Sequence, residues 1–434
     1  MRYLCLLCCA VWQLGSGCAD TKTTSPGQSP QSNTQKKTAS ATQAPVASPG
    51  QIKKIGAPLI QAKVVKTGKV ACFEQGAFRA DKPGAKKEQR LAYCEVSAVA
   101  SIGNRLLMAS DKEIPGAQRS SIFTVSHAVQ AGASSTEHNV GNTVKEYLPA
   151  SVFRHLKKAE DFAVTLDGKT VLLTSGFDRI KTDSKSWHVY NTVMAFPADA
   201  PEKGYVVNPS SAGEYGECSL ELRRAIALAL ADKTFPDGMP YFKVESLAVI
   251  PGQKVLFGVR EMGASYKTFS YTVTILVAPF SFKDDRITID ATQFELFYQM
   301  PVPTVRGHKA ALSSLAFDAK RNGLYMLTSY EEEVKNIELG GFLFFLDLSN
   351  ISKAGPEPTN PQLVYQSPDE LLHFGHKPEG VSLLDADTLI VVHDDDRVLK
   401  QVDVQFPNRN FEKQPEEAAY TILRLSNGVP KDAY

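Results

Sequence analysis

Three pairs of opposite charge share one spacing in this sequence. A lysine stands two residues before a glutamate in each of Lys158–Glu160, Lys243–Glu245 and Lys377–Glu379. Residues two apart on a strand point to the same face, so the two charges of a pair can meet or can pair with a neighbouring strand. Glu95 begins a similar stretch without the lysine, and Arg260 and Asp394 stand at the far end of equivalent stretches.

These charges allow two interpretations. Clustered carboxylates can hold Ca²⁺ through several oxygens, and the ion can then position a phosphate or an ester for hydrolysis. The alternative is that the lysines and glutamates only join neighbouring strands, as structural ion networks do. The sequence identifies no nucleophile or base, since it lacks a Gly-x-Ser-x-Gly elbow, a His-Glu-x-x-His motif and a Walker loop. Further acidic residues after the second apolar run of each stretch are Asp111, Asp178, Glu331 and Asp396.

The elements that carry these residues repeat five times. Each copy has an acidic or polar residue, an alternating apolar run, a turn and a second apolar run, and the copies begin at Glu95, Glu160, Glu245, Ser313 and Glu379. Turn residues such as Gly103-Asn104 and Asn322-Gly323 separate the two runs, which is typical of hairpins. A hairpin repeat cannot bury both faces alone, so the chain is predicted to be an all-β propeller.

The number of blades is left at five or six. The apolar strands at the two ends of the domain, 59–73 and 419–425, either complete the fifth blade or form a sixth, and 398–406 is the predicted third strand of the fifth copy. A helix inserted at about 219–233, with Ser219 able to cap its start, explains the longer interval before Glu245. Two stacked β-sandwich domains are the alternative, disfavoured because the repeat runs on without a linker.

The stretch from Glu379 to Asp395 resembles the esterase-like-activity-of-phytase family and related propellers with Glu-Gly-Leu-Ala repeats. In those propellers the strand that carries the glutamate lies innermost, beside the central channel. The resemblance implies that Glu95, Glu160, Glu245 and Glu379 face the channel mouth, and that Ser313 interrupts the ring of charge. It implies no particular reaction.

The N-terminus has the features of an export signal. Arg2 and the apolar run 3–14 are typical of a signal peptide. The following Gly15-Ser-Gly-Cys18 resembles the lipobox of bacterial lipoproteins, which implies that 1–17 is removed and that Cys18 carries a lipid. Gly15 stands where leucine is usual, so an ordinary secretory signal is the alternative. The Ser/Thr/Gln/Pro-rich segment 18–54 is predicted to be a disordered linker, and 55–434 is predicted to form the propeller domain.

Export bears on the cysteines of the domain, because disulfides form outside the cytosol. Cys72 and Cys94 bracket a polar, lysine-rich segment and are the favoured pair, with Cys218 left free. The sequence alone does not exclude a bridge that involves Cys218.

Charge and the predicted anchor bound the function. The formal net charge of +1 argues against nucleic acid as the main partner. Ala19 after the lipidated cysteine favours the outer membrane, so the predicted location is the cell envelope, facing the periplasm or the outside. The predicted function is a membrane-anchored binding or scaffold module for an envelope protein or a glycan. A metal-dependent hydrolase of phosphoesters, esters or lactones is the alternative, with Ca²⁺ as the candidate ion.

Overall fold

The computed structural model describes residues 60–427, apart from the segments 79–90, 117–118, 132–135, 180–184, 212–216, 334–336 and 350–359. The chain divides into the units Met1–Ile55 and Gly56–Tyr434, and every described residue belongs to the second. The predicted signal peptide, Cys18 and the linker therefore lie outside the described residues. Within the described part, every helix is too short or too polar to cross a bilayer.

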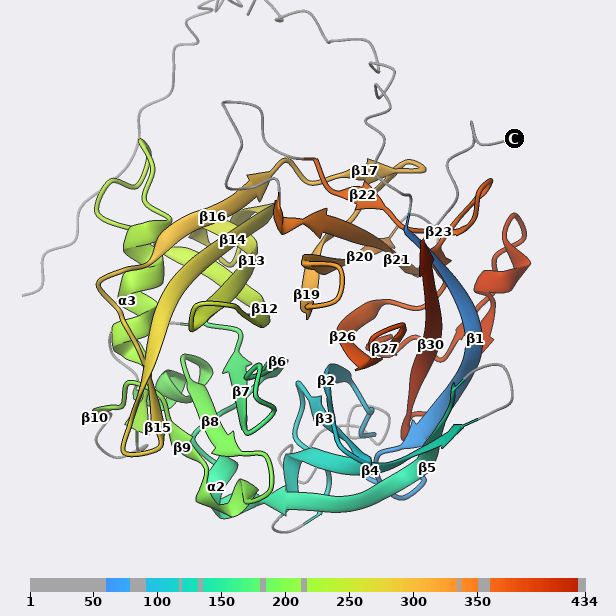
Figure 1. Cartoon of the computed structure of the whole chain (residues 1–434), viewed down its shortest axis with the longest axis horizontal. Helices are drawn as coiled ribbons and strands as arrows, with labels where there is room; N and C mark the ends of the chain where they lie inside the picture. Colours follow the sequence, from blue (N-terminus) through green and yellow to red (C-terminus); the bar gives the residue numbers. More distant parts are fainter. Residues whose placement is uncertain are drawn as a thin grey trace, which may run out of the picture. The chain divides into compact units, whose positions relative to one another are not determined.

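The described strands of the second unit are grouped into five blades around a ring (Figure 1). Blades one and five are joined in one sheet, because their outer strands pair at Ala71 and Thr143. The innermost strands are β2 (Val96–Ile102), β6 (Ala159–Val164), β12 (Tyr241–Ile250), β19 (Ala311–Asp318) and β26 (Pro378–Asp385). Each inner strand contacts the inner strands of both neighbouring blades, which closes the ring. The described residues therefore confirm the predicted propeller, and the blades number five.

Each blade follows its inner strand with antiparallel strands that lead outward. Blade one continues with β3 (Arg105–Ser110), β4 (Arg119–Ala131) and β5 (Thr136–Pro149). Blade two continues with β7 (Thr170–Ser175), β8 (Val193–Pro197) and β9 (Tyr205–Val206). Blade three has β13 (Lys254–Ser265) and β14 (Thr268–Lys283), and β14 pairs with both β15 (Arg286–Ile289) and β16 (Glu295–Met300). Blade four has β20 (Gly323–Glu333), β21 (Ile337–Asp347), β22 (Gln362–Leu363) and β25 (His373–Phe374).

Shorter elements connect the blades. The two-residue pairs are β10 (Ser210–Ser211) with β11 (Glu217–Cys218), β17 (Thr304–Val305) with β18 (His308–Lys309), and β28 (Lys400–Gln401) with β29 (Phe411–Glu412). Strands β23 (Tyr365–Ser367) and β24 (Glu370–Leu371) also pair. The remaining turns of helix are α2 (Ala150–Phe153) and the 3₁₀ segments Lys185–Tyr190, Pro201–Lys203 and Pro407–Arg409.

Strands from both ends of the domain complete blade five. Its order is β26, β27 (Thr388–His393), β30 (Glu417–Asn427) and then β1 (Ile60–Ala71), which runs antiparallel to β30. This settles the alternative between five and six blades. The third strand predicted at 398–406 is wrong, because β30 takes that place beside β27. The segment is interrupted by Asp403, whose Oδ1 accepts hydrogen bonds from two nearby backbone N–H groups and forms a turn.

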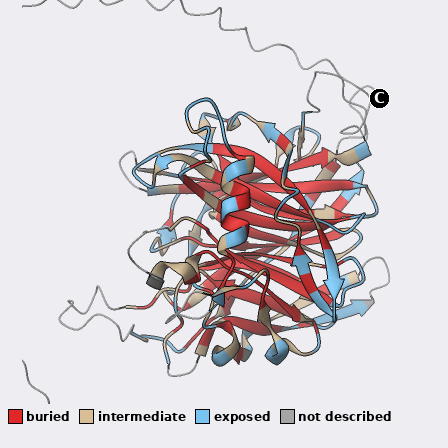
Figure 2. Ribbon diagram, turned by 90° about the vertical axis from the view of Figure 1, so that its left-hand side faces the viewer, coloured by how far each residue is buried: buried red, intermediate tan, exposed pale blue. Residues whose placement is uncertain are grey.

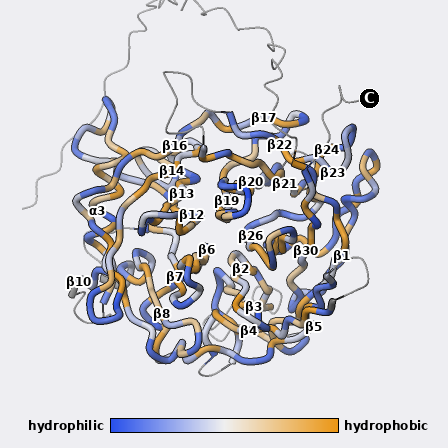
Figure 3. The backbone as a smooth tube through the Cα atoms, in the orientation of Figure 1, coloured by the Kyte–Doolittle hydropathy of each residue, from blue (hydrophilic) through white to orange (hydrophobic). Residues whose placement is uncertain are grey.

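The core lies between neighbouring blades. Figure 2 shows the strands buried through the body of the ring, and Figure 3 shows apolar residues following the same strands. Between blades three and four, Leu256 and Val273 belong to the same apolar cluster as Leu312 and Met326. Each such side chain contributes roughly 1.5–3 kcal/mol when fully buried. A blade is therefore stable only between two neighbours.

The inserted helix α3 (Leu220–Ala229) is shorter than the predicted span. It ends before Asp232, whose Oδ1 accepts hydrogen bonds from the backbone N–H groups of Thr234 and Phe235 and turns the chain. Ser219 occupies the N-cap position, as predicted, but its hydroxyl makes no capping hydrogen bond. Its hydroxyl donates to the Val207 carbonyl over 2.6 Å and accepts from the Val193 N–H, which fixes the helix to blade two. Figure 2 shows that one side of α3 is buried.

A disulfide joins Cys72 and Cys94, with their Cα atoms 6.0 Å apart. Cys72 follows β1 at the outer edge of blade five, and Cys94 precedes β2 at the centre of blade one. Both backbone N–H groups donate to carbonyls of the blade-five loop, at Glu416 and Pro415. The bridge therefore fastens the ring where its two ends meet. Cys218 is buried and lies outside the bridge.

Removing the bridge should destabilise the closed ring. The double variant Cys72→Ala/Cys94→Ala should lose about 3 kcal/mol of unfolding free energy, because the bridge closes a loop in the unfolded chain. Urea unfolding of the oxidised protein measures the loss. Cys218→Ala is the matched control, and it should lose less. A double variant as stable as the wild type would contradict the assigned role in ring closure.

Candidate functional site

Backbone bulges position the repeated polar residues at the start of each inner strand. In copies two to five the inner strand has one extra residue opposite its partner, and these residues are Glu160, Glu245, Ser313 and Glu379. In the first copy the extra residue is Ser97. A bulge turns its side chain out of the regular alternation of a strand. The glutamates thus leave the blade-to-blade core and reach the charged side chains of the next blade.

Glu160 lies between two lysines. Lys158 Nζ is 3.2 Å from Glu160 Oε1 and 2.7 Å from Asp178 Oδ2, within blade two. Lys243 of blade three is 3.6 Å from the same Glu160 oxygen and also contacts Glu245. The lysine-glutamate pairs therefore meet within a blade and also link adjacent blades.

A second group of pairs lies across blades four, five and one. Lys377 Nζ is 3.4 Å from Glu379, 2.8 Å from Asp396 and 3.7 Å from Glu331. On blade one, Lys112 lies 2.8 Å from Glu95 Oε2 and contacts Asp111. Together these residues make up the charged mouth, defined as Glu95, Asp111, Lys112, Lys158, Glu160, Asp178, Lys243, Glu245, Arg260, Glu331, Lys377, Glu379, Asp394 and Asp396.

Arg260 fills the neutral position of blade four. Its guanidinium donates to the hydroxyls of Ser313 over 2.9 Å and Ser329 over 3.0 Å, and to the Leu312 carbonyl. Ser329 in turn donates to Glu379 over 3.3 Å. The ring of polar contacts therefore continues through the arginine where the resemblance implied an interruption at Ser313.

Burial makes the glutamates unequal. Burial and the neighbouring Glu245 raise the pKa of Glu160 to about 8. Burial acts in the same direction on Glu245, but Lys243 and Arg260 lower its pKa to about 2. The pair therefore holds one proton at neutral pH. Burial and Asp396 likewise raise the pKa of Asp394. The mouth contains more carboxylates than cations, so part of its negative charge is compensated by protons.

Three of the carboxylates lie close enough to share an ion. Oxygens of Glu95, Asp394 and Asp396 all lie within 4.8 Å of one another, and among the described residues this is the one such acidic group. Glu95 comes from blade one, and the two aspartates follow β27 in blade five. The group therefore sits where the ring closes.

The channel is closed below the mouth. Asp161 of blade two is fully buried and accepts hydrogen bonds from the Leu247 N–H of blade three and the Ser314 hydroxyl of blade four, both over 3.0 Å. Ser314 in turn accepts from the Val381 N–H of blade five. A side chain that reaches from blade two to blade four must cross the axis. These contacts therefore close the axis of the ring below the mouth.

The mouth is accessible at its rim. The side chains of Lys112, Asp396 and Glu331 are 37%, 35% and 41% exposed, so the opening lies over blades four, five and one. On blade three, the hairpin between β13 and β14 extends past the start of β12 and exposes Tyr266 and Tyr271. Aromatic side chains thus border the charged mouth.

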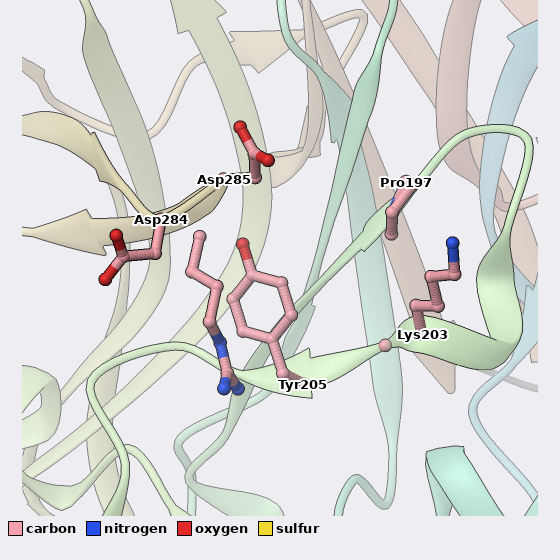
Figure 4. Close-up of a pocket in the computed structure, with 7 residues that line it drawn as sticks. Pro197, Lys203, Tyr205, Asp284 and Asp285 are labelled. Atoms are coloured by element: carbon pink, nitrogen blue, oxygen red, sulfur yellow. The ribbon is translucent and has the colours of Figure 1, made fainter.

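A separate surface pocket of about 330 Å³ lies between the outer parts of blades two and three. Tyr205 stands between the Asp284–Asp285 turn on one side and Lys203 with Pro197 on the other (Figure 4). The Arg286 guanidinium stacks 4.2 Å from the Tyr205 ring. This pocket shares no residue with the charged mouth.

The nine charged residues singled out in the sequence all reach the mouth: Glu95, Glu160, Glu245, Glu379, Lys158, Lys243, Lys377, Arg260 and Asp394. Sequence reasoning missed Lys112 and Asp161. Lys112 follows its apolar run and so lacks the lysine-before-glutamate spacing. The unusual second acid after Glu160 was the one available signal for Asp161.

Comparisons with known proteins leave the family open. No protein-family model matches the chain, so the resemblance to phytase-like propellers has no support there, and no curated protein matches. Among solved structures, a protein of unknown function from Dyadobacter fermentans is similar with a TM-score of 0.33 and 10% identity, over 85% of this chain and 100% of that one. A PQQ-bound aldose sugar dehydrogenase from Streptomyces coelicolor has 0.30 and 11%, over 85% and 100%. A GH43_12 protein from a capybara gut metagenome has 0.36 and 7%, over 87% and 59%. Similarities this low carry no argument about activity.

The raised pKa of Glu160 predicts a pH dependence. The pKa of Glu160 is raised from 4.5 to about 8, so the stability that its proton provides is complete below pH 4.5 and is lost as the pH rises through 8. The wild type should lose roughly 1–3 kcal/mol more than Glu160→Gln between about pH 6 and pH 9. Urea unfolding at both pH values measures the difference. Equal pH dependence in the two proteins would show that Glu160 carries no proton.

Proposed function

We propose that the protein is a binding module of the cell envelope, and that a protein or glycan ligand docks on the charged mouth. The observation that supports this most is convergence. Charged side chains from all five blades meet at one end of the ring, and several of them are partly exposed. A rigid ring that gathers polar groups in one place offers a preformed surface for recognition.

The side chains of the charged mouth favour binding of a ligand over its hydrolysis. A hydrolase needs a nucleophile that a substrate can reach, beside a base. The hydroxyls next to Glu379 belong to Ser313 and Ser329, which are fully buried and bonded to Arg260. The hydrolase alternative therefore rests on water as the nucleophile, activated by a mouth carboxylate or by a bound cation.

The rim supplies the contacts that a ligand would meet first. Tyr266 and Tyr271 stand exposed on the blade-three hairpin, and the Arg260 guanidinium lies 5.4 Å from the Tyr271 ring. Tyrosine is enriched in protein interfaces because it combines apolar area with a polar end. The same ring can stack on a sugar, so these tyrosines fit either class of ligand.

Removing the two exposed rim tyrosines should weaken retention of the ligand. Full-length protein with Tyr266→Ala/Tyr271→Ala should retain envelope material at least about tenfold less than the wild type, the loss expected for two interface tyrosines. Leu166→Ala is the matched control, because Leu166 is similarly exposed but stands on a turn of the opposite face. Retention measured after protease or glycosidase treatment of the envelope tells a protein ligand from a glycan. Unchanged retention by the tyrosine variant would exclude the mouth as the docking face.

The location is part of the proposal. A lipid on Cys18 would hold the propeller at the envelope through the linker 18–54, which is supported by the lipobox-like residues before Cys18. No helix in the described part of the propeller is long and apolar enough to span a membrane. Stable membrane attachment through lipid takes two or more acyl chains, or one chain with a second signal.

Labelling with a radioactive fatty acid in a bacterial host tests the anchor. The wild type and Cys9→Ser should incorporate the label, and Cys18→Ser should lose it, because Cys18 is the proposed acceptor. Label retained by Cys18→Ser would place the lipid on another residue, and a wild type without label would leave export without a lipid.

A further inference from the structure

We infer that Glu95, Asp394 and Asp396, with Asp111 next to them, form a site for one divalent cation of the Ca²⁺ type at the join between blades one and five. The cation site rests on the proposed function, because the ion would shape part of the surface that the ligand meets. All the proposed ligands belong to this chain.

The spacing of the oxygens suits calcium. Two oxygens bound to one Ca²⁺ at 2.3–2.6 Å can lie up to about 5 Å apart, and the three oxygens here all lie within 4.8 Å of one another, so one ion can contact all three. Mg²⁺ demands about 2.0–2.1 Å and a strict octahedron. The backbone is also held in place, because the Asp396 N–H donates to Asp394 Oδ1 over 2.8 Å and the Cys72–Cys94 bridge adjoins Glu95.

Asp111 provides a second, independent observation. Its side chain is only 9% exposed, and its Oδ1 is buried without a hydrogen-bond partner. The other oxygen contacts Lys112, whose ammonium also lies 2.8 Å from Glu95 Oε2. Lys112 therefore joins Asp111, which has one unpaired oxygen, to Glu95 of the acidic group. A buried acceptor left unsatisfied costs about 1–3 kcal/mol, which ligation of a cation would relieve.

The balance of charge points the same way. Four carboxylates share two ammonium groups, and one of these, Lys377, also lies near Glu379 and Glu331. A divalent ion would supply the positive charge that this side of the mouth lacks. Lys112 is 37% exposed, so it can swing into solvent as the ion enters. Lys112 then acts as the counterion of Glu95 and Asp111 when no ion is bound.

Calorimetric titration of the full-length protein with CaCl₂ tests the site. One ion should bind per chain, with a Kd of about 10⁻⁴–10⁻³ M as in other extracellular calcium modules, and MgCl₂ should bind at least about tenfold more weakly. Asp394→Asn/Asp396→Asn should weaken Ca²⁺ binding at least about tenfold, because it removes two ligand charges. Asp387→Asn is the matched control, since Asp387 is an aspartate of blade five whose ion pairs with Lys320 and Arg321 lie outside the mouth, and it should bind as the wild type does.

A change in the opposite direction separates a metal site from a structural cluster. Lys112→Ala should tighten Ca²⁺ binding several-fold, because it removes the competing ammonium, whereas a purely structural cluster gains nothing. Folded wild-type protein that shows no saturable heat up to about 10 mM CaCl₂ would overturn the site, as would an unchanged Kd in Asp394→Asn/Asp396→Asn. Circular dichroism verifies that each variant is folded.

Failure of the site and failure of the proposed function are distinguishable. Absence of calcium binding, together with loss of envelope retention in Tyr266→Ala/Tyr271→Ala, would refute the ion and leave the binding module intact. Calcium binding together with unaltered envelope retention in Tyr266→Ala/Tyr271→Ala would support the cation site and refute the mouth as the docking face.

Discussion

Closure of the ring is the constraint on which the rest of this structure depends. Each blade has two apolar faces, and only a neighbour on each side covers both. The antiparallel pairing of β1 with β30 provides the last neighbour, and the Cys72–Cys94 bridge fastens the same place. The acidic group of the mouth draws Glu95 from blade one and its two aspartates from blade five. Fold and candidate site are therefore completed by the same event.

The mouth is costly in energetic terms. Burial of a charge costs several kcal/mol, and an ion pair recovers this only with good geometry and additional hydrogen bonds. Arg260 has such bonds, whereas burial and the neighbouring Glu245 raise the pKa of Glu160 although two lysines lie beside it. Apolar residues would serve stability equally well at many of these positions. Retention of so many buried charges at one end of the ring supports the proposal that the mouth recognises a ligand.

Local patterns in the sequence were sufficient for the ring and for most of the mouth. The repeated glutamates and the turns between apolar runs predicted the blades, and the lysine spacing predicted which charges would gather. The bulges escaped prediction, because an extra residue is defined only against its partner strand. Arg260 and Asp161 act across two or three blades, a reach that no local spacing encodes. The segment 398–406 alternates like a strand, but Asp403 turns the chain and β30 pairs instead.

Site-specific photo-crosslinking in living cells tests the central claim most directly, because it asks which face of the ring meets a partner. A benzophenone amino acid would replace Tyr266 at the mouth in one strain and Leu166 on the opposite face in another, since both side chains are exposed, at 66% and 55%. The account predicts a discrete adduct from position 266 and none from position 166. An adduct from position 166 alone would contradict it.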